Sequence, residues 1–578
     1  MNLNLKPLTL SISLLLCASN SLPSYAETPV EPLKPDAGLL MRESRIPAIV
    51  PKPKPESEVE KPEAARPAML PQNDLKVTVK NFLFTGNTQF SNSDLAGVLS
   101  KYTNHQIRFN DLEAAANAIT QYYREAGFFL ALAYLPQQSI KEGQVEIAIL
   151  EGQLDNTHLT SDTIQTIGEM RMNKSVIKQF LDTYSEGDLV TEKDMNRISL
   201  LINDLPGIDG TVVLAPGKKT NTSSLSVKVK EQPMISGYAT ANNHGLYSTG
   251  YFRFDGGVTI NNPLGIGDQL SLRAQTTDSA GSTSGSADYS LPVNGYGTRF
   301  TASISELHYN LGRQFVSAHA EGIARTVAGA LSHPFWLARN GRLTGTARYE
   351  HRWMEDKIPT SNTDRELNVM SFSFSGSYYD QLLALGGLTQ AYINVSAGEV
   401  SFNNKAAFNL DQQKGGLDSN GGYHKFAWQV SRTQNILDDL SLFANFQGQV
   451  ASKNLDTSER MSLGGPSAIR AYPAGEGSGA EGWMFNGEAR YHIPEIPYVP
   501  GYLQLIGFID TGYSRVNAIP LVGDNSRHLT GYGFGLNWLE VSGFNLRTSM
   551  AWRDTKKQPT SDSTAQGAMM YFQVIKTF

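Results

Sequence analysis

The chain has 578 residues, which is too long for one ordinary domain, so two or more domains are expected. Its formal net charge of −6 is small for this length and gives no reason to expect a nucleic-acid partner. Apolar content is moderate, aromatic residues are plentiful, and the 52 glycines exceed the usual share of about 7%.

Residues 1–26 have the features of a secretory signal peptide. Lys6 supplies the positive charge, residues 8–18 form an apolar core, and residues 24–26 give a small-x-small cleavage site. The only cysteine, Cys17, lies in this segment. A lipoprotein signal is the alternative, although Leu16 stands where such a signal needs a small residue. The mature chain would then contain no cysteine and no disulfide.

After the signal peptide, the sequence contains no apolar run near the ~18–20 residues that a membrane-spanning helix needs. The chain is therefore expected to be exported without membrane-spanning helices. That leaves a soluble periplasmic or secreted protein, or a β-barrel.

Residues 27–74 are rich in proline, lysine and glutamate, a composition that cannot bury a core. We expect an extended, polyproline-like linker in this region. Residues 36–46, D-A-G-L-L-M-R-E-S-R-I, are the one stretch here that could form a short amphipathic helix, and a disordered tail is the alternative.

Two tandem α+β modules are predicted after the linker, at residues 75–153 and 154–232. In the first, a strand over residues 76–87 precedes two helices with Ser91 and Asn110 as expected N-caps, and two strands follow. The same β-α-α-β-β order recurs in the second, where Thr191 is expected to cap a helix. An unpaired sheet edge in each module could accept an extended polypeptide as a further strand; alternatively, both modules are spacers.

Residues 233–578 contain strand-like segments separated by clusters of Gly, Asn, Asp and Ser. Each segment has about ten residues, alternates apolar with polar or small residues, and carries aromatic residues toward its ends, which is typical of a transmembrane β-barrel. The region accommodates about sixteen antiparallel strands, enough to enclose a water-filled lumen. A soluble β-sandwich or propeller is the competing interpretation.

The last predicted strand, M-M-Y-F-Q-V-I-K-T-F, ends on Phe578 at the carboxyl terminus. Lys576 interrupts its apolar face near the end, where the amine could reach the membrane interface. A terminal phenylalanine on such a strand resembles the assembly signal of outer-membrane proteins. The apolar face consists of Met570, Phe572, Val574 and Phe578.

A long loop over residues 460–482 is predicted within the barrel region, because its glycines and prolines forbid a regular strand or helix. Arg470 lies near its centre. Further along the chain, the strand pattern G-F-I-D-T-G at residues 507–512 carries one carboxylate, Asp510, which is costly to bury unless it is paired. We predict that Arg470 and Asp510 meet inside a large pore and act as a latch for the loop.

These features resemble the outer-membrane transporters of two-partner secretion, the TpsB or ShlB/FhaC/HecB family. The resemblance covers residues 75–578 and rests on two POTRA-like modules, the barrel and the loop motif. Members carry V-R-G-Y/F at the tip of a loop folded into the lumen, and its arginine pairs with the aspartate of a strand motif F-x-D-x-G. The matching residues, with the glycines that precede the loop motif, are Gly464, Gly465, Ile469, Arg470, Ala471, Tyr472, Phe508, Asp510 and Gly512.

Ala471 departs from the family pattern, which has glycine there, and would be strained if this position needs a positive φ. The resemblance implies an outer-membrane location with the modules in the periplasm, and a helix at residues 36–46 that plugs the pore. It also implies a partner, an unfolded β-helical exoprotein of haemolysin or adhesin type, that binds the modules and is exported to the cell surface or the medium.

No catalytic constellation, cofactor site or paired metal-ligand spacing stands out in the sequence. Gly477, Gly479 and Gly482 spell G-x-G-x-x-G, but no strand precedes them and no helix follows, which argues against a dinucleotide site. The alternative function is a barrel-assembly factor that inserts other outer-membrane proteins, although such relatives typically carry more modules. A passive porin is a third candidate, but it would have no reason to keep modules or a plug.

Overall fold

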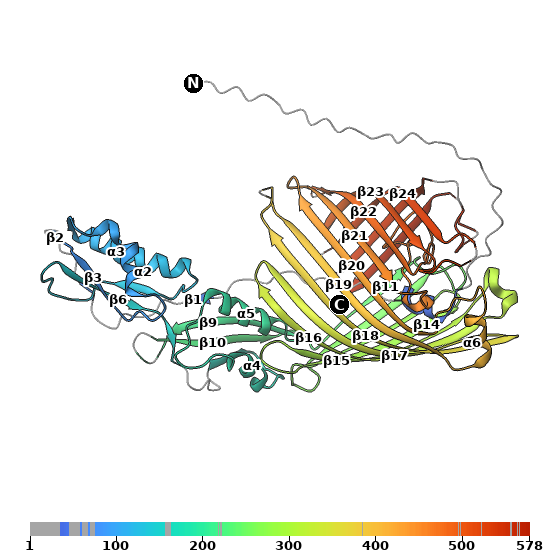
Figure 1. Ribbon diagram of the computed structural model, residues 1–578, viewed down its shortest axis with the longest axis horizontal. Helices are drawn as coiled ribbons and strands as arrows, with labels where there is room; N and C mark the ends of the chain where they lie inside the picture. The colour runs from blue at the N-terminus through green and yellow to red at the C-terminus, as the bar shows by residue number, and fades with distance from the viewer. Residues whose placement is uncertain are drawn as a thin grey trace, which may run out of the picture.

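The computed structural model describes residues 35–44, 58–59, 68–69, 76–155, 163–217, 219, 222–383, 385–494, 496, 499–521, 523–540, 542–554, 558–562, 564–565 and 567–578. The predicted signal peptide and most of the predicted linker lie outside these residues. Two small α+β modules lead into a large barrel (Figure 1). None of the described helices is long and apolar enough to cross a membrane.

Within the described residues, strands β11–β26 form one closed barrel of sixteen antiparallel strands, which confirms the predicted fold class. The barrel closes where β11 pairs with β26, and the amide N–H of Phe578 donates to the Gly237 carbonyl across this seam at 3.0 Å. The first eight strands are β11 (Ile235–Asn242), β12 (Arg253–Asn261), β13 (Gln269–Thr277), β14 (Ser282–Pro292), β15 (Arg299–Asn310), β16 (Glu321–Ala338), β17 (Gly341–Ile358) and β18 (Ser361–Asp380). The other eight are β19 (Gly387–Phe402), β20 (Gly421–Asn435), β21 (Leu440–Ala451), β22 (Glu481–Ile493), β23 (Tyr502–Arg515), β24 (Ser526–Leu539), β25 (Phe544–Arg553) and β26 (Met569–Thr577).

Several barrel strands are longer than the ten residues that the sequence predicted. Strands β16–β19 contain 18, 18, 20 and 16 residues. The start of β18, S-N-T-D-R, is polar on both faces and still pairs with β17. Alternating apolar residues mark only the part of a strand that faces lipid, so they do not reveal where pairing ends.

The first module contains β2 (Lys76–Thr78), β3 (Asn81–Thr85), α2 (Asn92–Val98), β4 (Gln106–Arg108), α3 (Phe109–Glu125), β5 (Leu132–Tyr134) and β6 (Gln144–Leu150). Its sheet has the order β3-β6-β5, and both helices bury apolar side chains against it. Ser91 caps α2 as predicted. The predicted cap Asn110 is wrong, because Arg108 is the N-cap of α3 and Asp111 accepts its backbone N–H at 2.8 Å.

The second module contains β7 (Gln153–Leu154), β8 (Ile164–Ile167), α4 (Lys174–Leu181), α5 (Glu192–Asn203), β9 (Ile208–Pro216) and β10 (Thr222–Glu231). Thr191 forms a capping box with Asp194 at the start of α5. Strands β8 and β9 both pair with β10, and the apolar faces of α4 and α5 pack on this sheet. The order β8-α4-α5-β9-β10 agrees with the predicted repeat.

The second module contacts the turns that join β12 to β13, β14 to β15 and β16 to β17. The backbone N–H of Asn173 donates to the Gly265 carbonyl at 2.8 Å. The Arg197 guanidinium donates to the Tyr296 carbonyl at 3.2 Å, and Arg339 Nε donates to Asn196 Oδ1 at 2.6 Å. At the start of β17, Arg342 forms an ion pair with Asp204. This module therefore lies against one end of the barrel, to its left in Figure 1.

Two short segments from the linker region lie on the sheet edges of the modules. Strand β1 (Glu58–Val59) pairs in parallel with β9 of the second module. In the first module, Ala68 forms a bridge to Pro136, and the Met69 N–H donates to the Leu135 carbonyl at 2.9 Å. Both modules thus carry an extended piece of this same chain at an edge.

Candidate functional site: a latched loop and a helix inside the barrel

The loop between β21 and β22 folds into the barrel and packs on its inner wall. It spans residues 452–480 and contains the short helix η4 (Thr457–Glu459). Residues 481 and 482, which the sequence assigned to the loop, begin β22. The apolar contact between loop and wall consists of Leu463, Ile469, Ala471 and Tyr472 with Met484, Ile506, Phe508, Leu529 and Ala551.

Arg470 at the loop tip and Asp510 on β23 form the ion pair that was predicted from the sequence. The Arg470 Nε lies 2.9 Å from Asp510 Oδ2 and Nη2 lies 2.7 Å from Oδ1, a two-pronged contact. The backbone N–H of Arg470 also donates to Asp510 Oδ2, at 3.1 Å. Asp510 has no exposed surface and Arg470 is 9% exposed, so the pair is almost fully withdrawn from water.

Two polar residues of β22 that the sequence analysis missed complete this site. Glu488 Oε1 accepts from Arg470 Nη1 at 2.7 Å. Asn486 pairs with Asp510 across the strands and donates its amide to Asp510 Oδ1 at 2.9 Å. Their spacing of two residues, which places both on the inner face, was the available signal.

The guanidinium of Arg470 also lies over the ring of Phe508, with 3.5 Å from Cζ to the ring centroid. Burial lowers the pKa of Arg470, but hydrogen bonds and charges from Asp510 and Glu488 outweigh it, so the pKa is above its ordinary value. Arg470 therefore stays charged, and the loop tip is held by charge, hydrogen bonds and ring contact together.

Ala471 is not strained, contrary to the concern raised by its departure from the family pattern. It is absent from the described residues with positive φ. Its methyl group fits because β24 has Gly531 opposite: a Cβ at Gly531 would lie 2.3 Å from Cβ of Ala471. Likewise, a Cβ at Gly512 would lie 3.1 Å from Cδ1 of Ile469, so Gly512 makes room for the loop.

The remaining predicted residues lie around this contact. The Tyr571 hydroxyl of β26 donates to the Tyr472 carbonyl at 2.7 Å, which joins the loop to the last strand. The N–H of Gly464 donates to the Glu476 carbonyl at 2.9 Å, and Gly465 has a positive φ of 128°. Phe578 lies at the barrel seam, far along the chain from the loop.

A short helix, α1 (Ala37–Glu43), lies inside the barrel against β15, β16, β17 and the loop. Asp36 caps it by accepting the Leu39 N–H at 2.9 Å. The Ala37 N–H donates to Asp356 Oδ1 on β17 at 2.8 Å. Two carboxylates thus satisfy free amides at the start of this helix. Its apolar residues Leu39, Leu40 and Met41 are buried.

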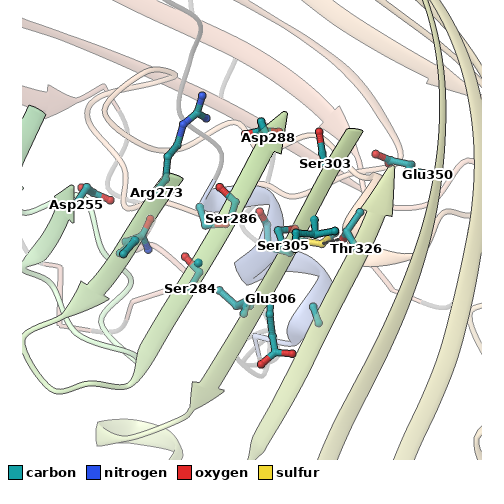
Figure 2. Close-up of a pocket in the computed structure, with 18 of the residues that line it drawn as sticks. Asp255, Arg273, Ser284, Ser286, Asp288, Ser303, Ser305, Glu306, Thr326 and Glu350 are labelled. Atoms are coloured by element: carbon teal, nitrogen blue, oxygen red, sulfur yellow. Dashed lines mark hydrogen bonds between the residues drawn. The ribbon is translucent and has the colours of Figure 1, made fainter. Parts of the chain in front are cut away.

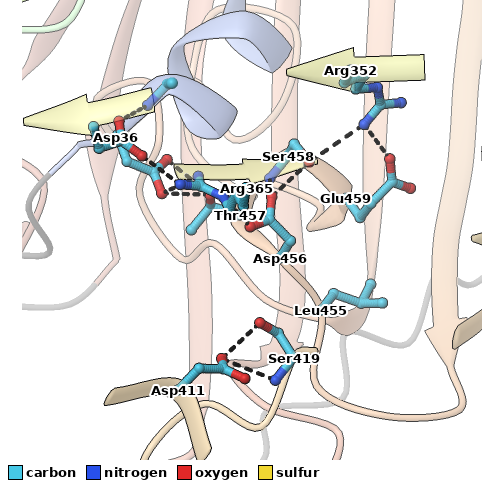
Figure 3. Close-up of polar contacts among 12 residues, drawn as sticks. Asp36, Arg352, Arg365, Asp411, Ser419, Leu455, Asp456, Thr457, Ser458 and Glu459 are labelled. Carbon is cyan, nitrogen blue, oxygen red and sulfur yellow. Dashed lines mark hydrogen bonds and ion pairs between the residues drawn. The ribbon is translucent and has the colours of Figure 1, made fainter. Parts of the chain in front are cut away.

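One arginine on β18, Arg365, connects the helix, the wall and the loop (Figure 3). Its Nη2 lies 3.1 Å from Asp36, Nη1 lies 2.5 Å from Asp356, and Nε lies 2.7 Å from Asp456 in the loop. Three carboxylates share this one guanidinium, whose side chain is only 3% exposed. We call Arg365 with Asp36, Asp356 and Asp456 the plug cluster.

The loop holds both ends of α1. At the carboxyl end, Arg42 Nη1 donates to the Arg460 carbonyl at 2.6 Å. At the amino end, the Thr457 hydroxyl donates to Asp36 at 2.6 Å. Burial raises the pKa of Asp36 above its ordinary value. For Asp456, burial acts in the same direction, but the charge of Arg365 outweighs it and the pKa is lowered.

The plug cluster could not be predicted from the sequence, because its members come from three segments that are far apart in the chain. No group of three or more His, Cys, Asp or Glu side chains suited to a metal ion occurs in the part of the chain that the structure describes. Polar contacts around Arg470 and Arg365, together with apolar packing, hold the loop and α1 inside the barrel.

Comparison with known proteins decides the family. The family model described as haemolysin secretion/activation protein ShlB/FhaC/HecB matches residues 221–538, and the model of the ShlB-type POTRA domain matches residues 77–152. This chain belongs to the haemolysin secretion/activation family. The predicted resemblance to two-partner secretion transporters is thereby confirmed.

Known proteins resemble this chain in sequence and in fold along most of its length. The heme/hemopexin transporter protein HuxB of Haemophilus influenzae is 27% identical over 554 residues, which cover 94% of this chain and 95% of HuxB. The outer membrane transporter CdiB of Dickeya dadantii is 21% identical over 446 residues, 75% of this chain and 76% of CdiB. In fold, the solved CdiB from Escherichia coli has a TM-score of 0.69 at 20% identity, covering 90% of this chain and 93% of that structure.

As a member of the haemolysin secretion/activation family with a closed barrel of sixteen strands, the protein is an outer-membrane pore that exports a protein partner. Its POTRA region lies in the periplasm. The predicted transport function and location are therefore confirmed.

Proposed function

We propose that this transporter binds an unfolded exoprotein by strand addition at the edges of its two modules and then passes it through the barrel. The observation that carries this proposal is that both edges already accept extended polypeptide. Segment 58–59 pairs with β9, and segment 68–69 bonds to residues 135–136 beside β5. An edge that pairs with one extended segment offers the same backbone groups to another.

Export then requires α1 to leave the lumen and the part of the loop around Asp456 to be repositioned, while Arg470 keeps the loop tip on the wall. The contacts at both ends of α1 are ion pairs and hydrogen bonds, which water can replace once the helix moves. No nucleotide-binding motif is present in the sequence, so net movement comes from the exoprotein folding outside, which prevents its return. This route needs no catalytic residue and no cofactor.

The exoprotein is expected to be a large β-helical protein of haemolysin or adhesin type. It reaches the modules unfolded, because strand addition needs an extended segment whose backbone groups are not yet paired. Backbone pairing at the module edges then supplies the affinity, and contacts with alternate side chains supply the specificity.

Insertion of other barrels into the membrane is the second candidate function. The solved BamA from Haemophilus ducreyi lacking POTRA domains 1–3 has a TM-score of 0.50 at 16% identity, which shows a shared fold and nothing more. The match to the secretion family over residues 221–538 favours export.

To test export, the gene is deleted and the culture medium is inspected for loss of a large, cysteine-poor protein, with the wild-type gene restored as control. We expect this protein to vanish from the medium and to return on complementation. Unchanged secretion together with a general loss of outer-membrane barrels would instead support the assembly function. For docking, Met69→Pro removes the N–H that this chain's own linker donates to the Leu135 carbonyl, with Met69→Leu as the matched control. The freed edge should retain more exoprotein in pull-down, and unchanged retention would count against strand addition at this edge.

A further inference from the structure

The proposed function leaves open which side of the lumen the exoprotein follows. We infer that the unfolded exoprotein crosses the lumen along the wall of β13–β16, where short hydroxyl side chains provide weak and exchangeable hydrogen bonds. This inference rests on the proposed function and assigns the track within the same pore.

A cavity of about 380 Å³ lies beside this wall even with α1 in place. Figure 2 shows four serines that line it, two on each of two neighbouring strands. Ser286 of β14 pairs with Ser305 of β15, and Ser303 is two residues away on the same face. We call Ser284, Ser286, Ser303 and Ser305 the serine track.

The alternation of side chains places the serine track inside the barrel. Ile304 lies between two track residues and is 58% exposed, as expected for a residue that faces lipid. On the next strand, Val327 is 48% exposed, whereas its neighbour Thr326 is buried and lines the cavity. Track residues and lipid-facing residues therefore alternate along these strands.

No hydroxyl of the serine track has a hydrogen-bond partner within the described part of the chain. Each hydroxyl can both donate and accept, so each can bond a peptide N–H or a peptide carbonyl of a passing chain. Transport needs binding that is strong enough for entry and weak enough for exit, and several equivalent weak sites satisfy both conditions.

The rest of the lumen is less suited to passage. Near β17 and β18, the groups of the plug cluster are already engaged with α1 and the loop. Near β22–β24, the wall is covered by the latched loop. The inward-facing charges at the margins of the cavity are of both signs and do not select a charged cargo; they are Asp255, Arg273, Asp288, Arg348 and Glu350.

Two contacts connect the serine track with the earlier and later steps of export. The second module attaches to the turns at the periplasmic ends of β12–β17, so a chain released from it arrives at this side of the lumen. On the other side of the cavity lies α1: Met41 lines it, and the Thr326 hydroxyl donates to the Met41 sulfur at 3.4 Å. Departure of α1 would therefore widen this same cavity.

The test uses the full transporter with single cysteines, because Cys17, in the predicted signal peptide, is the chain's only cysteine. Ser286→Cys and Ser303→Cys are labelled with a thiol-linked photo-crosslinker. The probe is the exoprotein identified by gene deletion, fused to a disulfide-closed domain that stalls it in the pore. Ser373→Cys on β18, which faces the lumen outside the cavity, and Ile304→Cys on the lipid face are the controls.

We expect crosslinks from positions 286 and 303 to the stalled exoprotein and none from positions 373 and 304. Stalled exoprotein that crosslinks to 373 and not to 286 or 303 would overturn the inference. As a functional measurement, Ser286→Phe with Ser303→Phe should slow export about tenfold, with Ser373→Phe as control. Export within about twofold of wild type in the double variant would also overturn it.

These results separate the inference from the function on which it depends. If the unmodified transporter releases no exoprotein, the proposed function fails and the track fails with it. If the unmodified transporter exports normally and the double phenylalanine variant does so as well, only the serine track is wrong.

Discussion

Two arginines organise the lumen, and their surroundings differ. Arg470 lies in the loop and reaches to the wall, where Asp510 is fully buried and Glu488 and Asn486 complete the contact. Arg365 lies in the wall and reaches inward to the plug cluster, where the side chains of Asp36 and Asp356 keep 26% and 17% of their surface exposed.

This difference indicates distinct roles. The buried, bidentate ion pair of Arg470 with Asp510 is costly to break, because either partner alone would be left as an unpaired buried charge. The plug cluster has three acids for one guanidinium and some access to water. Releasing α1 from it therefore costs less free energy than breaking the pair of Arg470 and Asp510. We therefore interpret Arg470 as the lasting anchor of the loop and Arg365 as the releasable hold on α1.

Replacing Arg470 with alanine should have the largest effect. Asp510 would remain buried without its partner, at a cost of roughly 3–5 kcal/mol, and export should fall about a hundredfold or more. The measurement is exoprotein in the medium, with heat-modifiable mobility in gels to show that the barrel is still inserted. Arg470→Lys should keep only part of the function, because an ammonium cannot form the two-pronged contact. Wild-type export by Arg470→Ala would refute the latch.

Loss of Arg365 should affect the plug more than export. In Arg365→Ala, three carboxylates face one another without a counter-charge, so α1 should leave and channel currents in planar bilayers should rise about tenfold. Arg325→Ala is the control, because that arginine forms an exposed pair with Glu306 worth at most about 1 kcal/mol. Equal currents in both variants would show that Arg365 does not hold the helix.

A smaller effect is expected from Gly531→Ala, which places a Cβ 2.3 Å from that of Ala471. Overpacking of this kind costs about 1–3 kcal/mol and should loosen the loop, with a several-fold loss of export. Adding Ala471→Gly removes the clash and should restore export. Failure of this second change to rescue would mean that the two residues do not contact each other in the working transporter.

The smallest predicted effect is a dependence of plugging on pH. The pKa of Asp36 is raised in the plugged state, so α1 is held best below the ordinary carboxyl value of 3.8 and less well as pH rises through the raised value. Asp456, whose pKa is lowered, loses its contribution only at pH values below that range. Currents should therefore increase about twofold as pH rises from the ordinary carboxyl value of 3.8 through the raised value of Asp36. In Asp36→Asn this dependence should disappear; if it persists, another group is responsible.

The sequence predicted the barrel well because lipid imposes a simple rule on each strand. Alternation of apolar and polar residues identified the region, its strand number and the lone Asp510, whereas the ends of β16–β19 were missed because paired residues outside the membrane carry no such pattern. At the first module, capping signals located α2, but the start of α3 was placed two residues late, at Asn110 and not Arg108.

By itself, the sequence determined that Arg470 and Asp510 belong together, since a charge in an apolar strand needs an opposite charge. It could not determine that Glu488 joins them, or that Arg365 gathers Asp36, Asp356 and Asp456 from a helix, a strand and a loop. Those contacts depend on barrel closure, which brings distant strands around one space. The pairing of neighbouring strands depends on residues that are close in the sequence. Which side chains meet across the lumen is determined only when the barrel has closed.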